Sequence, residues 1–232
     1  MHGRMRSLGL VLAVMGIGFI AAGSFAFLKT YEGYNSLNAL SAAQDVRLSY
    51  NDQGQLTDHG DAASAQSILG LLRDEWKYPV NMGDLNPNDP VVNTATEFMF
   101  QMATITHHIT SGTQTVVLPA DVTAADGTVY KAGTYEFAVD GRYFSQFNRA
   151  NPIEGKARDQ AWSATGLALI SNLGVGTATA TALQLGLGIA GLFAGFGLFA
   201  LVAGFGLVWV ARAATEEERA PKVVLQPRAM PA

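Results

Sequence analysis

Two adjacent histidines, His107 and His108, are the residues whose type most directly suggests metal chemistry. They lie in a stretch with helical spacing, and adjacent helical residues point about 100° apart, so the pair does not easily bind one metal ion together. A further ligand would have to come from elsewhere in the chain, such as His59, and nothing in the sequence places His59 nearby. We therefore predict neither a metal site nor a cofactor. The only candidate metal ligands that we single out, as weak ones, are His107, His108 and His59.

Acidic residues are frequent in the central part of the chain, but their spacing matches no known site. The run Asp58-His59-Gly60-Asp61 does not follow the EF-hand loop. Neither a Gly-x-Ser-x-Gly elbow nor a phosphate-binding loop occurs, and the absence of cysteine excludes disulfides and thiolate catalysis. We expect a solvated acidic surface without catalytic residues, and the sequence favours a non-catalytic protein over an enzyme.

Aromatic residues of the same region offer a third interpretation, a pocket for a small molecule or a lipid. Its lining would be Trp76, Tyr78, Phe98, Phe100, Tyr143 and Phe147. Such aromatics are more often the core of a small domain.

Two apolar tracts lie before and after the region that holds these residues. Residues 8–28 contain no ionisable side chain, and neither do residues 162–211, of which 185–211 is the most apolar part. A bilayer core about 30 Å thick needs roughly 20 apolar residues as helix. We predict transmembrane helices over 8–28 and 185–211, with a helical lead-in over 162–184 whose polar residues disfavour a third span. The first tract could alternatively be a cleaved signal peptide, since Ser24-Phe25-Ala26 has small residues at a suitable spacing.

The charge distribution predicts the orientation. Arg4 and Arg6 precede the first tract, and Arg212, Arg219, Lys222 and Arg228 follow the second. Residues 29–160 hold nine Lys/Arg and sixteen Asp/Glu, a formal charge of −7. Basic flanks remain in the cytoplasm. We therefore expect a multi-pass cell-membrane protein with residues 1–7 and a disordered tail over 212–232 in the cytoplasm, and an extracytoplasmic domain over 29–161.

This central domain is predicted to be small and α+β. Helices are expected over 62–77, after an Asp61 N-cap, and over 91–110, capped by Asp89-Pro90 and closed by Gly112. Residues 50–60 resemble a loop, whereas 115–118 and 134–139 alternate as strands, with Asp126-Gly127 and Asp140-Gly141 as hairpin turns. Asn151-Pro152 then opens the final helical stretch.

Glycine is unusually frequent in the second tract. Small residues let membrane helices approach closely, so we predict helix packing through Gly186, Gly188, Gly191, Gly195 and Gly197. The partner would be the first span, a second copy of the chain or another protein. Membrane lipids are the other expected partner, and nucleic acid is not.

Residues 6–27 and 163–207, with a vaguer match at 103–108, resemble short actinobacterial membrane proteins of unknown function, some of them labelled aromatic ring-opening dioxygenases. The resemblance implies the two-span architecture with an outer domain. A non-haem iron site would need two histidines and a carboxylate that converge, and the sequence assembles no such trio.

We expect an accessory or scaffolding subunit of a larger membrane complex, and as the alternative a metal- or ligand-binding module or enzyme centred on the His107/His108 helix.

Overall fold

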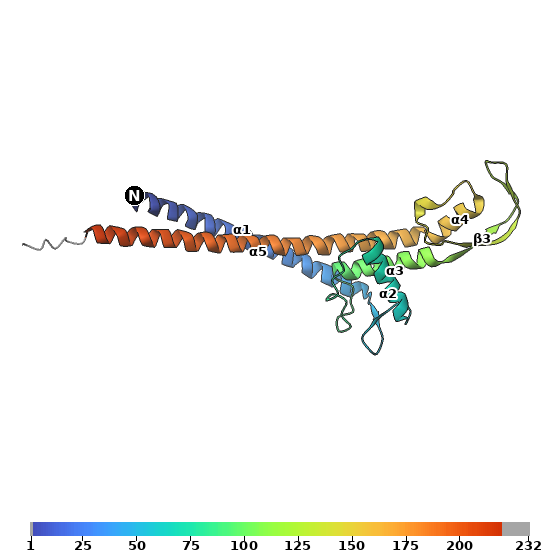
Figure 1. The fold of residues 1–232 in the computed structure, drawn as a ribbon, viewed down its shortest axis with the longest axis horizontal. Coiled ribbons are helices and arrows are strands. Elements are labelled where there is room, and N and C mark those ends of the chain that lie inside the picture. Colours follow the sequence, from blue (N-terminus) through green and yellow to red (C-terminus); the bar gives the residue numbers. More distant parts are fainter. Residues whose placement is uncertain (1, 220–232) are drawn as a thin grey trace, which may run out of the picture. The chain divides into compact units, whose positions relative to one another are not determined.

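The structure is a computed structural model that describes residues 2–219. It is mostly helical, with two long apolar helices and several short strands (Figure 1). This agrees with the predicted class at the level of helices and a small sheet region. Two compact units are distinguished: the helix pair, residues 2–33 and 183–219, and the polar domain, residues 34–182.

The helix pair consists of parts of α1 (His2–Gln44) and α5 (Ala164–Arg219). Both helices are long and apolar enough to cross a membrane, judged by length and composition. Their outward faces carry large apolar side chains; Val14, Phe199 and Trp209 are each more than two-thirds exposed. Soluble proteins rarely leave so much contiguous apolar surface in water.

Glycines on both helices let α1 and α5 approach closely. A Cβ atom on Gly16 would lie 2.7 Å from the carbonyl oxygen of Gly197. One on Gly204 would lie 2.6 Å from the carbonyl oxygen of Gly9. A side chain at either position would force the backbones apart, so close packing of the pair depends on these glycines.

The helical half of the polar domain packs α2 (Ala62–Gly70), with its π-helical continuation η1 (Leu71–Glu75), against α3 (Ala95–Ser111). Asp61 caps α2, as predicted, by accepting a hydrogen bond from the N–H of Ala63 at 2.8 Å. Ile68, Leu69 and Leu72 recur at helical spacing and are almost completely buried. Their burial forms the core of this half.

A capping box begins α3. Thr94 Oγ1 accepts a hydrogen bond from the Glu97 N–H, and the Glu97 carboxylate accepts from the N–H groups of Asn93 and Thr94 at 2.9 and 2.8 Å. Burial raises the pKa of the Glu97 carboxyl above its usual value, although these hydrogen bonds favour its charged form.

The predicted start of this helix at residue 91 is wrong. Asp89 instead closes a separate turn with Asn86 through a 3.0 Å backbone hydrogen bond. The Thr94 capping box satisfies two N–H groups reciprocally and therefore outcompetes the Asp89-Pro90 signal. The predicted closure at Gly112 is confirmed, because Gly112 is the C-cap residue.

The β half contains β3 (Thr113–Leu118) paired antiparallel with β6 (Gly133–Ala138), and β4 (Val122–Thr123) paired with β5 (Val129–Tyr130) in their connection. Asp126-Gly127 forms the β4–β5 turn, as predicted. Asp140-Gly141 is not a hairpin turn, because it ends β6 and Gly141 donates to the Thr110 carbonyl at 2.9 Å. The short 3₁₀-helix η2 (Phe144–Gln146) and α4 (Pro152–Ala161) follow, and Ala157 of α4 packs on β3.

A further strand pair lies where the sequence predicted a loop. β1 (Ser49–Tyr50) pairs antiparallel with β2 (Leu56–Thr57). Each strand is only 2 residues long, so the turn residues between them dominate the local sequence signal.

The first part of α5 belongs to the polar domain. Gly166 faces the side chain of Ile109, and Gly176 faces the ring of Phe98, so this segment packs along α3. The predicted helical lead-in, from residue 164 on, and the predicted span over 185–211 form one continuous helix, α5. Residues 212–219, predicted to begin a disordered tail, are helical, and α5 ends at Arg219. The rest of that predicted tail lies outside the described residues.

Candidate metal centre

A tight turn places Asp58 and His59. Asp58 and Asp61 exchange two backbone hydrogen bonds of 2.9 Å across His59 and Gly60. Both central residues have positive φ, 52° and 85°, which two-residue type I′ turns require. Positive φ is uncommon for a residue other than glycine. Because Asp61 also caps α2, the turn connects β2 directly to α2 and holds Asp58 at that junction.

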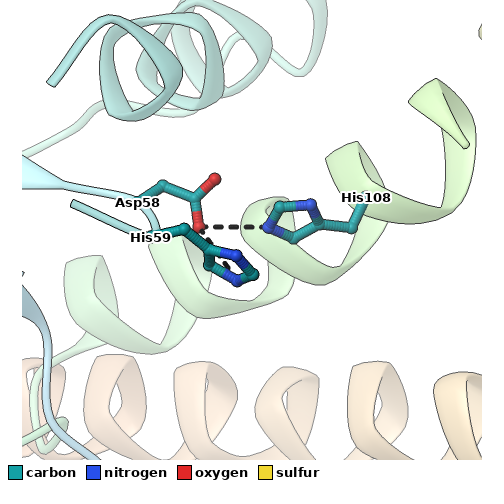
Figure 2. Close-up of side chains that lie close together, drawn as sticks. All are labelled: Asp58, His59 and His108. Atoms are coloured by element: carbon teal, nitrogen blue, oxygen red, sulfur yellow. Dashed lines mark hydrogen bonds and ion pairs between the residues drawn. The ribbon is translucent and has the colours of Figure 1, made fainter. Parts of the chain in front are cut away.

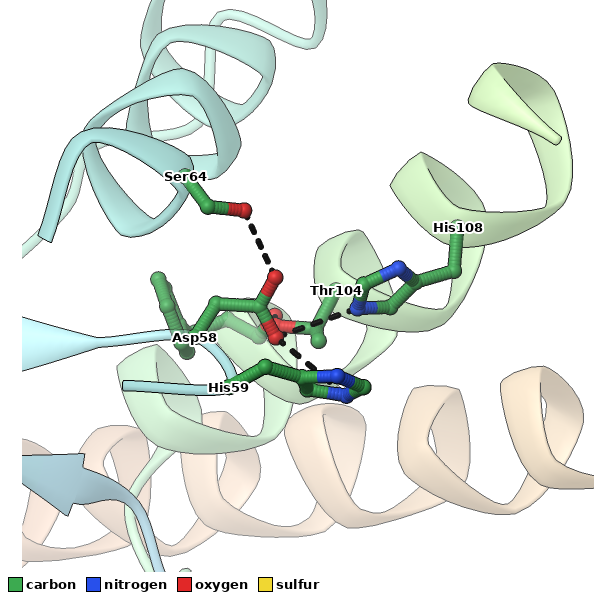
Figure 3. Close-up of polar contacts among 6 residues, drawn as sticks. Asp58, His59, Ser64, Thr104 and His108 are labelled. Carbon is green, nitrogen blue, oxygen red and sulfur yellow. Dashed lines mark hydrogen bonds and ion pairs between the residues drawn. The ribbon is translucent and has the colours of Figure 1, made fainter. Parts of the chain in front are cut away.

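Helix α3 brings His108 to the same junction. Figure 3 shows the Asp58 side chain between Ser64 of α2 and His108 of α3, with Thr104 one turn before His108. The His108 side chain is 44% exposed, whereas that of Asp58 is only 6% exposed. The carboxylate is thus the buried anchor of the cluster, and the histidines lie on its solvent side.

The three side chains converge on one point (Figure 2). His108 Nε2 lies 3.0 Å from Asp58 Oδ1, and His59 Nε2 lies 3.9 Å from the same oxygen. The other oxygen, Oδ2, accepts a hydrogen bond from Ser64 Oγ at 2.6 Å. One ligand atom from each of Asp58, His59 and His108 lies within 4.8 Å of the other two.

Hydrogen bonding keeps the Asp58 carboxyl ionised. Burial alone would raise its pKa, but hydrogen bonds from Ser64 and His108 and the nearby histidine charges lower the pKa below its ordinary value of 3.8. A carboxylate must be deprotonated to bind a metal ion. Asp58 is therefore already in the state that ligation requires.

The donor set and spacing suit a divalent transition metal. Zinc–nitrogen and zinc–oxygen bonds of about 2.0–2.2 Å in a tetrahedral site separate the donors by roughly 3.3 Å. The Asp58–His108 distance is already close to that value. His59 must move closer, because its Nε2 lies 3.9 Å from Asp58 Oδ1 and its ligand atom lies within 4.8 Å of that of His108. Its side chain is 84% exposed and therefore has room to move. Two imidazoles and one carboxylate are also the donors of non-haem iron sites.

The expectation that two histidines and a carboxylate do not converge is therefore wrong. His59 lies beside His108, with ring centroids 4.9 Å apart. His107 takes no part, as the 100° separation predicted, and lines a separate pocket of about 460 Å³ with Glu75 and Asp140. Asp58 is the ligand that the sequence did not single out. The Asp-His-Gly-Asp turn was the available signal, but its partner lies 50 residues away.

The glycines predicted for helix packing fall into two groups. Gly186 faces Thr30, and Gly197 faces Gly16, so these two lie at the α1–α5 contact. The other three, Gly188, Gly191 and Gly195, have no atom of another residue near the position of a Cβ within the described part of the chain.

The aromatic residues proposed to line one pocket fall into two groups: Trp76, Tyr143 and Phe147 lie around one buried cluster, whereas Phe98 and Phe100 lie on α3. The Trp76 indole donates to the Tyr143 hydroxyl at 2.8 Å, Phe147 belongs to a buried cluster with Val139, and Phe98 packs on α5. Phe100 lines a small depression beside Asp58.

Comparison with protein-family models, curated proteins and solved structures finds no significant match to this chain.

Proposed function

We propose that this chain is a two-span membrane protein whose polar domain binds a divalent first-row transition metal through Asp58, His59 and His108. The observation that carries the proposal is their convergence: three ligand atoms within 4.8 Å, contributed by a turn and a helix that are remote in sequence. Imidazole nitrogen and carboxylate oxygen together suit zinc, iron and related ions.

The turn sets the position of the His59 ring. His59 has a φ of 52°, which the two-residue turn requires. In that conformation the exposed ring lies next to the buried carboxylate, although the closest approach of 3.9 Å is too long for a hydrogen bond. A metal ion between His59 and Asp58 would form one bond to each of these two side chains, which make no hydrogen bond with each other.

The membrane part of the proposal rests on the apolar helices and their basic flanks. The helices can cross a bilayer by length and composition, and Arg4, Arg6 and Arg212 border them. The positive-inside rule then places both termini in the cytoplasm and the polar domain outside.

Metal content tests the first part. The full chain, purified in mild detergent and stripped with a chelator, is titrated with Zn²⁺, Co²⁺ and Fe²⁺, and the bound metal is measured by mass spectrometry. One ion per chain is expected for the parent protein and none for His59→Ala/His108→Ala. His107→Ala is the matched control, since it removes the neighbouring imidazole, and it should retain full binding. Equal binding by all three proteins would refute the site.

Cysteine labelling tests the orientation, because the chain contains no cysteine. Asp52→Cys, in the exposed β1–β2 loop, should react with an impermeant maleimide on intact cells, and Gly3→Cys only after permeabilisation. Labelling in the reverse pattern would refute the proposed topology.

A second function, that of an accessory subunit, is favoured by the open glycines of α5. Gly191 lines an apolar groove of about 530 Å³ with Ala194, Phe27 and Leu28. Glycine weakens a helix by about 1 kcal/mol relative to alanine, so glycines without an internal contact are consistent with packing against another transmembrane helix.

Co-purification tests this second function. The tagged protein is extracted from its native membrane with Gly191→Leu as the variant and Gly18→Leu, another glycine with no neighbour at its Cβ position, as the control. Loss of a stoichiometric partner only in Gly191→Leu supports the subunit role. A monodisperse, solitary parent protein contradicts it.

A further inference from the structure

A small polar depression adjoins the proposed metal site. Asp58 and His59 form part of its wall, together with Arg47, Gln101 and Thr104. Its space is about 180 Å³, which is below the roughly 300–1,000 Å³ of pockets for drug-sized ligands. The depression is thus of a size for a few waters or a small ion.

Arg47 is the cation of this wall, and its backbone is anchored on both sides. The Leu48 N–H donates to the Pro90 carbonyl at 2.8 Å, and the Val92 N–H donates to the Val46 carbonyl at 2.9 Å. These bonds form an isolated antiparallel bridge between Arg47 and Val91. The guanidinium group therefore extends from a fixed position.

The guanidinium retains donors for a ligand. Its Nε binds Asp45 Oδ1 at 2.7 Å, and the side chain is 55% exposed. Among the described residues, neither terminal nitrogen has a hydrogen-bond or ion-pair partner. A guanidinium group presents its N–H donors in a fork that matches the two oxygens of a carboxylate or phosphate.

The charge balance also favours an anion. A divalent ion on one carboxylate and two neutral imidazoles retains a charge of about +1, and three protein ligands leave a coordination position open. Arg47 and Asp45 neutralise each other, so they do not cancel this charge. Two of the three proposed ligands, Asp58 and His59, border the depression.

We propose that the metal site binds a small oxyanion in this depression, one oxygen on the metal ion and another facing Arg47. The ligand class is a compact carboxylate, bicarbonate or inorganic phosphate. This inference rests on the proposed metal binding and specifies the ligand of that same site.

Cobalt spectroscopy tests the inference, since the visible spectrum of Co²⁺ changes when an anion enters its coordination sphere. The full chain in mild detergent is loaded with Co²⁺ and titrated with acetate, bicarbonate and phosphate, and with acetamide as the uncharged analogue of acetate. A saturable spectral change is expected with at least one small oxyanion and not with acetamide.

Arg47→Gln should weaken oxyanion binding roughly tenfold, the effect of losing one charge-assisted hydrogen bond at an exposed site. Its affinity for Co²⁺ should stay unchanged. Arg149→Gln is the control, because Arg149 is an exposed arginine outside the depression, and it should bind both as the parent does.

The two proposals fail in different ways. Failure of Co²⁺ to bind overturns both of them. Normal Co²⁺ binding without any response to the small oxyanions, or with equal responses in Arg47→Gln and the parent, overturns the oxyanion site alone.

Discussion

Replacing Asp58 by asparagine removes one charge from the centre of the site while keeping the shape of the side chain. The side chain is 6% exposed and accepts hydrogen bonds from Ser64 at 2.6 Å and from His108 at 3.0 Å. The substitution therefore affects both the stability of the metal-free domain and its affinity for metal.

The loss of stability follows from these two bonds. Hydrogen bonds to charged groups contribute about 1.5–3 kcal/mol each, and neutral ones about 1 kcal/mol. The amide oxygen of asparagine can keep one acceptor role, and the Ser64 hydroxyl can rotate to accept from its NH₂ group. We expect Asp58→Asn to lower the free energy of unfolding by about 1–3 kcal/mol, or the melting temperature by roughly 3–10 °C for a domain of this size.

The difference depends on pH with a defined sign. The Asp58 pKa is lowered below 3.8 in the folded state, so the native protein binds fewer protons than the unfolded chain as the pH falls. The stabilisation is complete above pH 3.8 and is lost as the pH falls through the folded pKa. The gap between parent and variant should therefore be constant near neutral pH and shrink below about pH 4.

Metal affinity should fall more strongly. Changes to groups that merely orient metal ligands cost 10–100-fold, so loss of the anionic ligand itself should exceed about 100-fold.

Tryptophan fluorescence and isothermal titration of the full chain in mild detergent measure both effects. Trp76 and Trp162 lie in the polar domain and report its unfolding. Asp52→Asn is the matched control, an exposed aspartate of the adjacent β1–β2 loop, and should behave as the parent. Parent-like stability and Zn²⁺ affinity in Asp58→Asn would refute the reasoning.

Three further predictions concern other groups. Glu97→Ala should lower the free energy of unfolding by about 1–3 kcal/mol, because it leaves two N–H groups at the start of α3 without their acceptor. As the Glu97 pKa is raised, the parent should gain stability over Glu97→Gln as the pH falls towards 4.5 in denaturant titrations, and a flat pH profile would contradict this. Tyr50→Phe should leave stability unchanged or raise it by up to about 1 kcal/mol, since the buried hydroxyl has no partner among the described residues and burial raises its pKa to about 12; a lower melting temperature would reveal a partner. Gly204→Leu should separate α1 from α5, because its Cβ position lies 2.6 Å from the Gly9 carbonyl oxygen, whereas Gly188→Leu should not; disulfide formation between cysteines introduced on the two helices measures this, and equal yields would disprove the packing.

Much of the local structure could be predicted from the sequence. The two apolar helices, the Asp61 cap, the Gly112 helix end and the Asp126-Gly127 turn depend on residues within a few positions of each other. The misplaced start of α3 is a competition between two local capping signals, and it was decided by the reciprocal bonds of Thr94 and Glu97.

The sequence by itself determined which residues could serve as metal ligands and which tracts are apolar enough for a bilayer, because residue chemistry and helical periodicity are local properties. Only the tertiary structure decided that His59 and Asp58 meet His108 while His107 points elsewhere. It likewise decided which glycines of α5 face α1. The physical reason is that packing of α2 on α3 brings together residues 50 positions apart, and no short-range pattern encodes such a contact.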